Sequence, residues 1–526
     1  MLIYSGTKQQ FDQDVLNDSI AHKIDYQFRI RGLSHENVSE FVSWENSLKK
    51  MQSVLADPDF GSDINIAVEY QIPMTSKRVD FLIAGTNYQD EENVVIVELK
   101  QWEEAGKTSR DGIVTAYTGR MVRAVTHPSY QAYSYAKTIE NFNATVQDEN
   151  ISLYPCAYLH NYKKSKLDEI VSPLYQEVIN LAPLYIKSEE VKLRNFIKKY
   201  VTKSSKSNLL FKIENGKIRP SKALQDTLAS MLNGNEEFVM IDEQKVVFET
   251  VKRLVEKAMK NNVKYTVIVE GGPGSGKSVV AIQLLTEFIT KRHLNVNYIT
   301  KNAAPRNVYF EKLKQGNFKL NYVKFLFKGS GSYVDSSKNE FDCLITDEAH
   351  RLNAKSGMFK NKGENQIKEI INASRVSVFF IDEDQVVTAS DIGSISEIKK
   401  WAKYCGSTLY YNEETKLASQ FRCNGSDGYI AFINDLLGIK KTANYDGFDI
   451  DYDLILYDSP EKMREDLREK NNINNKSRMI AGYCYEWRTK NSNDLAVYDI
   501  ELDNGFKARW NFSNTITWAI DEDSFD

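Results

Sequence analysis

The feature that most constrains the fold is a glycine-rich octapeptide, GGPGSGKS, at residues 271–278. It follows an apolar, β-branched run, YTVIVE, and precedes an apolar stretch with helical spacing, VVAIQLLTEFI. Glycines at such positions let backbone N–H groups surround phosphate oxygens, and the N-terminus of the following helix adds a favourable dipole. The sequence therefore predicts a strand, a phosphate-binding loop and a helix in direct succession.

The loop itself supplies the expected nucleotide contacts. These are Gly271, Gly272, Pro273, Gly274, Ser275, Gly276, Lys277 and Ser278. We expect Lys277 to reach the β- and γ-phosphates during catalysis, and the hydroxyl of Ser278 to ligate magnesium. The expected ligand of this loop is ATP with Mg²⁺.

A second nucleotide-binding element is FDCLITDEAH, in which an apolar strand ends in Asp347 and Glu348. Asp347 is expected to hold the magnesium ion through water. Glu348 is then placed to orient or deprotonate the attacking water. An Asp-Glu pair is common on protein surfaces, but its position after a phosphate-binding loop favours the functional interpretation.

Weaker candidates flank these two motifs. Gln385 ends the run VFFIDEDQ and is a candidate sensor of the γ-phosphate, and Gln244 carries an amide that can recognise an adenine edge. Downstream, SQFRCNGSDGY offers Gln420 and Arg422, whose guanidinium can pair with phosphate oxygens. Each of these is weak by itself, because an isolated Gln or Arg is usually solvated.

The rest of the chain alternates between strand-like and helical patterns. A helix is expected at 36–55, strands at 64–72, 78–84 and 94–99, a helix at 128–141, and further strands at 153–159 and 180–186. Strands at 265–270, 296–300, 343–346 and 376–381 then alternate with helices, which is typical of a parallel, doubly wound sheet. The polar stretch KKYVTKSSKSN marks a boundary near residue 205.

The first of these regions contains a separate set of charged residues. Asp80 lies in one expected strand, and Glu98 and Lys100 lie two residues apart in another, so both of the latter face the same side. Two carboxylates can bind Mg²⁺ or Mn²⁺, which activates water, while a lysine orients the nucleophile. A cross-strand ion pair is the simpler interpretation of an isolated Glu-x-Lys, but here the three residues adjoin strongly apolar strands.

This pattern resembles the PD-(D/E)XK nuclease superfamily over about residues 30–190. Gln131 and Tyr135 in QAYSY resemble the Gln-x-x-x-Tyr feature of its RecB-like members and lie one helical turn apart. The resemblance implies catalytic roles for Asp80, Glu98, Lys100, Gln131 and Tyr135, with Asp80 and Glu98 as metal ligands. Candidates for a further carboxylate are Glu40, Glu45 and Glu69, whereas His127 and His160 are interpreted as ordinary surface or packed histidines.

The second region resembles the Schlafen-group-3-type helicases of superfamily 1 over about residues 215–520. The resemblance includes the phrase NGKIRPSKALQDTLASMLNGNEEFVMIDEQ ahead of the phosphate-binding loop, and TKNAAPRN at the expected single-strand contact. It implies two RecA-like lobes, ATP hydrolysis between them and translocation on nucleic acid. The family continues into an Ile-His-Thr-x-Gln-Gly segment and an arginine motif that are absent here. We therefore expect either a sequence truncated within the second lobe, which is the favoured interpretation, or a motor that lacks half of its catalytic interface.

Composition sets wider limits. With 526 residues, 42% hydrophobic and 27% charged, the chain is expected to form two or three globular domains. The 68 basic and 72 acidic residues neither indicate nor exclude a nucleic-acid partner, and the basic stretch at 187–222 is equally compatible with a solvated surface and a phosphate contact. Scattered cysteines, no signal peptide and no apolar run of membrane length predict a cytoplasmic protein.

The sequence therefore predicts an α/β protein with a PD-(D/E)XK nuclease-like domain at 1–205 and a connector at 206–235. A P-loop RecA-like lobe follows at 236–410, and a partial second helicase lobe at 411–526. The expected function is ATP-dependent cleavage of DNA, and the resemblance to bacterial nuclease–helicase fusions suggests anti-phage defence. Alternatives are DNA repair or recombination, and a non-cleaving ATP-gated sensor. Expected partners are nucleic acid and either a second copy or a phage-derived activator, without a membrane.

Overall fold

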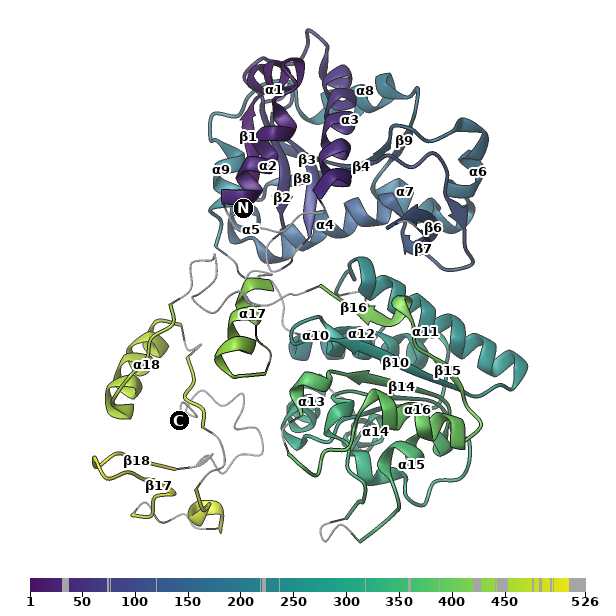
Figure 1. Ribbon diagram of the computed structural model, residues 1–526, viewed down its shortest axis with the longest axis vertical. Helices are drawn as coiled ribbons and strands as arrows, with labels where there is room; N and C mark the ends of the chain where they lie inside the picture. The colour runs from purple at the N-terminus through teal and green to yellow at the C-terminus, as the bar shows by residue number, and fades with distance from the viewer. Residues whose placement is uncertain are drawn as a thin grey trace. The chain divides into compact units, whose positions relative to one another are not determined.

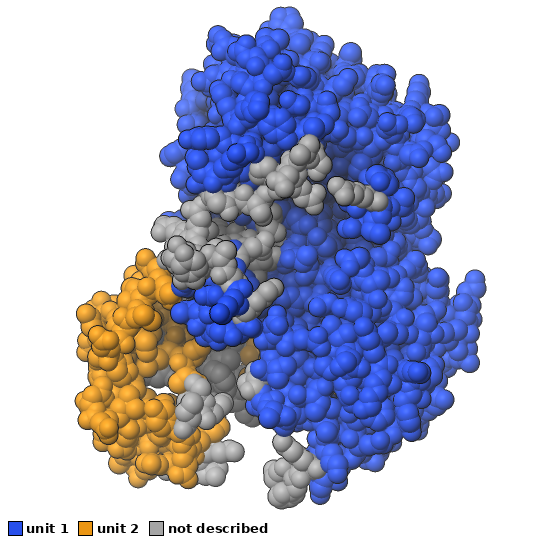
Figure 2. All heavy atoms as spheres, in the orientation of Figure 1, with its two compact units in different colours: residues 1–301, 330–450 blue, residues 302–329, 451–526 orange. Residues whose placement is uncertain are grey.

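The computed structural model describes the whole chain except residues 31–36, 73, 74, 76, 120, 218, 220–223, 236, 317, 358–360, 387, 420–426, 440, 442–452, 475, 476, 482–484, 492, 493, 495 and 510–526. The chain divides into two compact units (Figure 2). Unit 1 contains residues 1–301 and 330–450, and unit 2 contains residues 302–329 and 451–526. Both sets of candidate residues lie in unit 1, so the architecture of this unit decides how they are arranged.

The first sheet of unit 1 has the strand order β1-β2-β3-β4-β8-β9 (Figure 1). Its strands are β1 (Leu2–Thr7), β2 (Asn65–Gln71), β3 (Arg78–Thr86), β4 (Glu92–Lys100), β8 (Ser152–Leu159) and β9 (Leu184–Ile186). The first four strands pair antiparallel, whereas β4, β8 and β9 are parallel. The rich content of Val, Ile, Leu and Ala in β3 and β4 fits a sheet that is buried on both faces.

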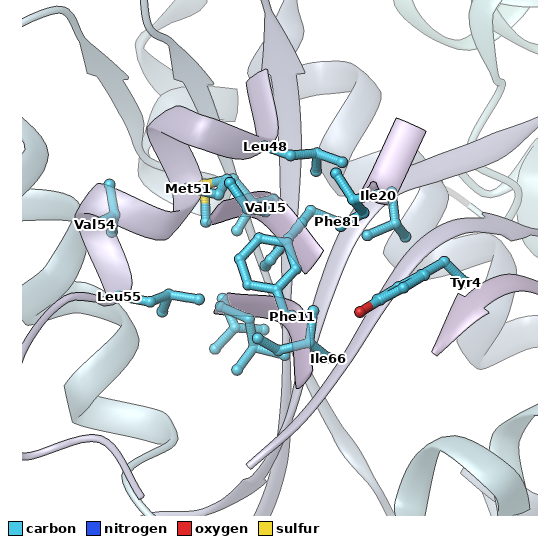
Figure 3. Packing of buried hydrophobic residues seen from close by; sticks show 14 of the residues in the cluster. Tyr4, Phe11, Val15, Ile20, Leu48, Met51, Val54, Leu55, Ile66 and Phe81 are labelled. Carbon is cyan, nitrogen blue, oxygen red and sulfur yellow. The ribbon is translucent and has the colours of Figure 1, made fainter. Parts of the chain in front are cut away.

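Three N-terminal helices cover one face of this sheet. They are α1 (Lys8–Leu16), α2 (Ile20–Ile30) and α3 (Asn37–Leu55). Figure 3 shows part of the resulting core, in which Phe11 and Val15 of α1 and Met51 of α3 pack with Ile66 and Phe81 of the sheet. This core fixes the positions of β2 and β3 beneath the helices.

The opposite face of the sheet packs against α4 (Pro128–Phe142) and α9 (Leu209–Glu214). Ile96 of β4, Tyr135 and Ile139 of α4, and Leu209 of α9 are buried together in this core. Since α9 lies beyond residue 205, the expected boundary falls inside this packed unit. Shorter helices complete the region: α5 (Ala144–Asp148), α6 (Leu167–Ile170), α7 (Gln176–Leu181) and α8 (Glu190–Tyr200).

Two features here differ from the sequence predictions. The stretch 180–186, expected as a strand throughout, begins inside helix α7, and only Leu184–Ile186 forms a strand. A three-stranded antiparallel sheet of β5 (Gly106–Lys107), β6 (Ile113–Thr118) and β7 (Met121–Thr126) was not expected. The β6–β7 hairpin has exposed apolar residues at its tip, which weakens the period-2 pattern that identifies a strand.

The second sheet of unit 1 is parallel, as predicted. Its strands run in the order β11-β13-β14-β10-β15, and β16 also pairs with β10. Their bounds are β10 (Tyr265–Gly271), β11 (Val296–Ile299), β13 (Phe341–Thr346), β14 (Ser374–Ile381), β15 (Thr408–Tyr410) and β16 (Lys416–Leu417). The four strands expected from the sequence are thus confirmed and lie side by side.

Helices pack on both faces of this sheet, so the doubly wound arrangement is also confirmed. On one face α15 (Gln366–Ala373) and α16 (Ile395–Tyr404) bury their apolar sides against Ile268, Leu344 and Phe379. The other face packs against α11 (Asp242–Asn261) and α12 (Lys277–Thr286). Unit 1 further contains α10 (Leu224–Leu232) and α17 (Asp427–Leu436).

Unit 2 is smaller. It contains α13 (Ala303–Gln315), α14 (Leu320–Leu326), β12 (Phe327–Lys328), α18 (Pro460–Asn474) and the antiparallel pair β17 (Ile500–Glu501) and β18 (Lys507–Ala508). A small apolar cluster around Ile500, Phe506 and Ala508 holds that pair. In the described part of the chain, no helix combines the length and the apolar character needed to cross a membrane.

Candidate functional site

The phosphate-binding loop connects the end of β10 to the start of α12, as the sequence predicts. Gly274 and Gly276 adopt left-handed backbone angles, with φ of 77° and 84°, which only glycine tolerates easily. Lys277 is 6% exposed, and its Nζ donates to the carbonyl oxygens of Gly271 at 2.7 Å and Gly272 at 2.9 Å. The side chain of Lys277 therefore lies across the loop in which it is expected to bind phosphate.

Ser278 and Asp347 are brought together as predicted. The Ser278 hydroxyl donates to Oδ2 of Asp347 at 2.6 Å, and the hydroxyl of Tyr298 on β11 donates to the same oxygen at 2.5 Å. Burial raises the pKa of Asp347, and the neighbouring Glu348 adds to this effect. A hydroxyl beside a buried carboxylate is the donor set that Mg²⁺ requires next to a nucleotide, so these two residues fit the expected ion.

Glu348 follows Asp347 in a left-handed conformation, with φ of 54°. Its Oε2 lies 3.0 Å from Nε2 of His350, and this hydrogen bond holds the pKa of Glu348 below its usual range. His350 is buried, and its Nδ1 has no hydrogen-bond partner among the described residues. The turn packs tightly, because a Cβ added to Gly393 would lie 1.9 Å from the carbonyl oxygen of Ala349. Glu348 is therefore held ionised and in a fixed orientation.

The end of β14 contributes to the same site. Nε2 of Gln385 donates to Oδ2 of Asp382 at 2.7 Å, and that oxygen lies 3.8 Å from Nζ of Lys277. Gln385 is thus linked to the lysine through Asp382, a residue that was not predicted. Such a position is compatible with a sensor of the γ-phosphate.

Gln244 lies in the first turn of α11 and contacts the phosphate-binding loop directly. Its Nε2 donates to the carbonyl oxygen of Ser275 at 3.2 Å, and its Oε1 accepts from the backbone N–H of Ile241 at 3.4 Å. Both ends of the amide are therefore engaged next to the loop. Gln420 and Arg422 lie outside the described residues.

The second candidate site lies in the first sheet, where the beginning of β3 pairs with the end of β4. The register that places Phe81 opposite Val97 puts Asp80 beside Glu98 at the next position. Oδ2 of Asp80 accepts from the backbone N–H of Leu99 at 2.7 Å, and Nζ of Lys100 lies 2.6 Å from Oε1 of Glu98. The three residues predicted from the sequence are therefore adjacent.

Burial makes these carboxylates costly to ionise. It raises the pKa of Asp80 to about 8, with the charge of Glu98 as the next cause, and it also raises the pKa of Glu98. The Oε2 atom of Glu98 is buried and makes no hydrogen bond among the described residues. A divalent cation would stabilise the buried carboxylate of Glu98, with its free oxygen, and the neighbouring half-buried carboxylate of Asp80, so the two residues fit the predicted ion.

Of the candidate third carboxylates, Glu69 lies closest to this pair, because the charge of Asp80 contributes to its raised pKa after burial. Glu69 accepts from Nε1 of Trp44 at 2.8 Å and from Nε of Arg78 at 2.7 Å, and Glu40 lies 3.0 Å from Nη2 of the same arginine. Among the described residues, Glu45 makes no hydrogen bond or ion pair with Asp80 or Glu98. Within the described ranges, no group of three or more His, Cys, Asp or Glu side chains is arranged to hold a metal ion. In the described part of the chain, the metal site that we consider here therefore consists of the carboxylates of Asp80 and Glu98.

Gln131 and Tyr135 are bonded to each other, as their spacing on α4 predicts. Nε2 of Gln131 donates to the hydroxyl of Tyr135 at 2.8 Å, and that hydroxyl donates to Oδ2 of Asp242 at 2.7 Å. Asp242 is the first residue of α11 and was not predicted from the sequence. It also acts on the carboxylate site electrostatically, because its charge contributes to the raised pKa of Glu98 after burial and the other charges there.

The two histidines have structural roles, as interpreted from the sequence. Nδ1 of His127 caps α4 by accepting from the backbone N–H of Ser129 at 3.1 Å, and its Nε2 lies 2.9 Å from the carbonyl oxygen of Ile170. Nε2 of His160 lies 3.0 Å from the hydroxyl of Ser47. The hydrogen bonds of both histidines therefore go to residues other than Asp80 and Glu98.

Four residues at these sites were not predicted from the sequence: Tyr298, His350, Asp382 and Asp242. His350 had a signal, since it stands two residues after Glu348 at the end of an apolar strand. The others had none that spacing reveals, because Tyr298 and Asp242 reach their partners from 49 and 107 residues away. Only the fold brings these side chains together.

Comparisons with known proteins bear on the second half of the chain. The model of the family described as "Schlafen group 3, DNA/RNA helicase domain" matches residues 264–526. Among solved structures, the crystal structure of Bacteroides sp Pif1 in complex with ADP-AlF4 is 10% identical, with a TM-score of 0.22, over 37% of this chain and 47% of that chain. The chain thus spans about half the length of that protein, and the likeness is too low to support an argument. No curated protein matches.

Proposed function

The chain belongs to the Schlafen group 3, DNA/RNA helicase domain family, and from that premise we propose that it combines an ATP-driven nucleic-acid motor with a metal-dependent nuclease. The motor is the RecA-like sheet that carries the phosphate-binding loop. The nuclease is the first sheet with α4 and α9, joined to the motor by a connector that ends near residue 235. The substrate that we propose for both is DNA.

The proposed nucleotide site uses residues that contact one another. Lys277 lies along the loop and is placed to transfer its hydrogen bonds from the carbonyls of Gly271 and Gly272 to phosphate oxygens. Ser278 and Asp347 would hold Mg²⁺, which neutralises charge on the phosphates when it is bound. Glu348, ionised beside His350, would accept a proton from the attacking water.

The proposed nuclease site rests on one observation above all. Glu98 is buried, with a free carboxylate oxygen, beside the half-buried Asp80, and Lys100 lies within 2.6 Å of Glu98. A divalent cation held by the two carboxylates would supply an activated water when bound. Lys100 is placed to orient the nucleophile or to stabilise negative charge on the phosphodiester. Gln131 of α4 lines the neighbouring cavity, and the buried Tyr135 accepts a hydrogen bond from the Gln131 amide.

Cleavage assays with the whole chain test this proposal. Asp80→Asn and Glu98→Gln should each remove Mg²⁺- or Mn²⁺-dependent cleavage of plasmid and linear DNA, because a neutral amide binds the cation poorly. Lys100→Ala should lose cleavage while retaining the cation, since an ammonium group is not a ligand. ATP hydrolysis should be unchanged in all three variants, because the phosphate-binding loop is a separate site.

The matched control is Asp90→Asn, on the β3–β4 connection, where the Asp90 side chain is exposed. It should cleave DNA at the parental rate. If Asp80→Asn and Glu98→Gln also cleave at the parental rate, the nuclease assignment fails, and a motor that only grips nucleic acid takes its place. Cleavage of RNA in preference to DNA would overturn the choice of substrate.

The biological setting that we propose is defence against phage, as in the nuclease–helicase fusions that the chain resembles. Phage plating on cells that express the parent or Asp80→Asn tests this step separately. Protection that is lost in the variant supports it. Equal plating with and without the parent protein contradicts it while leaving the biochemical activity intact.

A further inference from the structure

The first turn of α11 contacts both candidate sites of unit 1. Asp242 faces the carboxylate site, where its Oδ2 accepts from the hydroxyl of Tyr135 at 2.7 Å and its Oδ1 accepts from the hydroxyl of Thr126 at 3.3 Å. Lys77 lies 3.3 Å from the same Oδ2 and 2.7 Å from Oε1 of Glu243. A residue of the motor is therefore bonded into the nuclease-like domain.

Two residues further along the helix, Gln244 faces the nucleotide site. Its amide donates to the carbonyl oxygen of Ser275, at the centre of the phosphate-binding loop, at 3.2 Å. Between the two, Glu243 accepts from the hydroxyl of Ser419 at 2.9 Å. Ser419 follows β16, which pairs with β10 immediately before the loop. The path from the loop to Tyr135 thus runs through three consecutive residues.

The backbone at this position is strained. Asp242 has φ of 36°, a left-handed value that is unfavourable for a residue with a Cβ. Such strain persists only where surrounding contacts impose it, and here the contacts are those with Tyr135, Thr126 and Lys77. The strained residue is also the one that joins the two sites.

A cavity of about 650 Å³ lies beside this contact. Lys100 and Gln131 of the nuclease-like domain line it together with Asp242. Its wall also carries both basic and acidic side chains, namely Lys77, Arg123, Lys416, Glu243, Glu413 and Glu414. A negatively charged strand that approaches Lys100 through this cavity would pass Asp242. The residue is therefore placed where it can influence how substrate meets the carboxylate site.

We propose that Asp242 is a positioning residue that the motor supplies to the nuclease site, and that nucleotide binding at the phosphate-binding loop alters cleavage through the first turn of α11. This inference rests on the proposed function of both sites. Asp242 orients Tyr135, which in turn orients Gln131. When a nucleotide engages the loop or the Gln244 amide, the bond to Ser275 changes, and the turn moves Asp242 with it.

The test measures DNA cleavage by the whole chain with and without a non-hydrolysable ATP analogue, so that translocation cannot contribute. In the parent, the analogue should change kcat for cleavage by about fivefold or more, the usual lower range of coupling between two sites. Asp242→Ala should lower kcat about tenfold, with KM for DNA changed less, and kcat should no longer respond to the analogue. Asp242→Asn keeps an oxygen that accepts from Tyr135 and should restore most of kcat.

The matched control is Asp111→Asn. Asp111 of the nuclease-like domain pairs with Lys245 of α11 at 2.8 Å, so this variant loosens the same helix without touching Tyr135. It should keep both the parental kcat and the response to the analogue. Tyr135→Phe removes the hydroxyl that donates to Asp242 and should also abolish the response of kcat to the analogue. This variant therefore tests the hydrogen bond between Tyr135 and Asp242 even if Asp242→Ala unfolds.

Several results would overturn the inference. They are a parental response in Asp242→Ala, an equal loss in Asp111→Asn, or a parent whose cleavage ignores the analogue. A parent that does not cleave DNA at all contradicts the proposed nuclease instead, because the coupling then has no activity on which to act. The two failures are therefore distinguishable in one set of assays.

Discussion

Three acidic residues, Glu69, Asp242 and Glu348, share an uncommon property at the scale of single residues. Each has a positive φ, at 56°, 36° and 54°, and each carboxylate is held by partners at or beside a candidate site. Glu69 accepts from Trp44 and Arg78, as Asp242 does from Tyr135, and Glu348 pairs with His350. Backbone strain of this kind is concentrated at functional positions in proteins. Asp18 and Asp90 have a similar φ on connections between elements, so the strain supports the two sites only together with the contacts of these three carboxylates.

Glu348→Gln tests the role of the strained residue in the nucleotide site. We expect the variant to bind ATP as tightly as the parent, because the phosphates contact the loop and Lys277. Hydrolysis should slow by about 10²-fold or more, the contribution of a positioned general base. Steady-state ATP hydrolysis and binding of a fluorescent ATP analogue measure the two properties.

Glu383→Gln is the matched control, since Glu383 follows the neighbouring strand β14 but accepts from the backbone N–H of Ile395 at 2.7 Å. Its rate of hydrolysis should stay near that of the parent. A large loss of ATP binding in Glu348→Gln would instead assign Glu348 a structural role.

The buried His127 leads to a prediction about how the stability of the protein depends on pH. Burial lowers the pKa of His127 from its ordinary value near 6.5 to about 4, so the folded protein keeps the ring neutral while the unfolded chain takes up a proton. The stabilisation is therefore complete above pH 6.5 and is lost as the pH falls towards 4. The two pKa values correspond to about 3 kcal/mol in the free energy of unfolding.

His127→Asn should retain the cap of α4, because an Asn side chain also accepts from the N–H of Ser129. Denaturant unfolding at pH 7.5 and pH 4.5 measures the difference. The variant should lose less stability than the parent between these values, by up to about 3 kcal/mol. Equal losses in the two proteins would show that His127 does not carry this pH dependence.

At the scale of elements, the sequence predicts regular strands well and irregular ones poorly. The runs that became β3, β4, β10 and β14 are rich in β-branched and aliphatic residues, because both faces of their sheets are buried. The strand β1 and the helices α1 and α2 carry short or mixed patterns, and their place in the sheet depends on residues far away in the sequence. Helix α9 has six residues and is stabilised by tertiary packing, so its own pattern is uninformative.

The packing of α9 predicts that it is part of the first domain. Leu209 is fully buried against the sheet, whereas Phe211 on the same helix is 60% exposed. Leu209→Ala should therefore lower the free energy of unfolding of that domain by about 2–5 kcal/mol. Denaturant unfolding followed by tryptophan fluorescence measures the change, because Trp44 lies in the domain.

Phe211→Ala is the matched control and should change stability by less than about 0.5 kcal/mol. Similar losses for the two variants would mean that the helix does not pack as described. No loss in Leu209→Ala would return the domain boundary to the neighbourhood of residue 205.

The candidate sites also contain both residues that the sequence predicts and residues that it does not predict. Spacing alone predicts the pair Gln131 and Tyr135, because residues four apart on a helix share a face, and a hydrogen bond joins them. It also predicts that Asp347, at the end of its strand, meets Ser278 beside the phosphate-binding loop. Asp242 could not be predicted, since its partner Tyr135 lies on helix α4, which packs against the first sheet, and only the tertiary fold of unit 1 brings the two residues together.

At the scale of the whole of unit 1, a buried arginine links the nuclease-like domain to the motor. Nη1 of Arg110 donates to Thr250 of α11 at 2.8 Å and to Oε2 of Glu414 at 3.0 Å, and its Nη2 donates to Oε1 of Glu414 at 3.3 Å. Arg110 is 5% exposed, so this paired geometry offsets the cost of burying its charge. The link is bidentate, which favours one orientation between the two sheets.

Arg110→Ala should weaken this link by about 3 kcal/mol, because Glu414 keeps its charge without its main partner. We expect the connector that leads into α11 to become more sensitive to limited proteolysis, while nucleotide binding at the phosphate-binding loop persists. Replacing both partners by apolar residues, as Arg110→Met with Glu414→Leu, should restore much of the resistance, since both charges of the pair are then removed. Arg253, which lies 3.6 Å from Glu414, keeps its hydrogen bond to Tyr410. The control is Arg375→Ala, because Nη1 of Arg375 donates to Asn262 within the motor at 2.5 Å and should not affect the connector. Parental resistance in Arg110→Ala, or no recovery in the double variant, would mean that the two sheets are held together by apolar packing and by the contacts of Asp242 rather than by this ion pair.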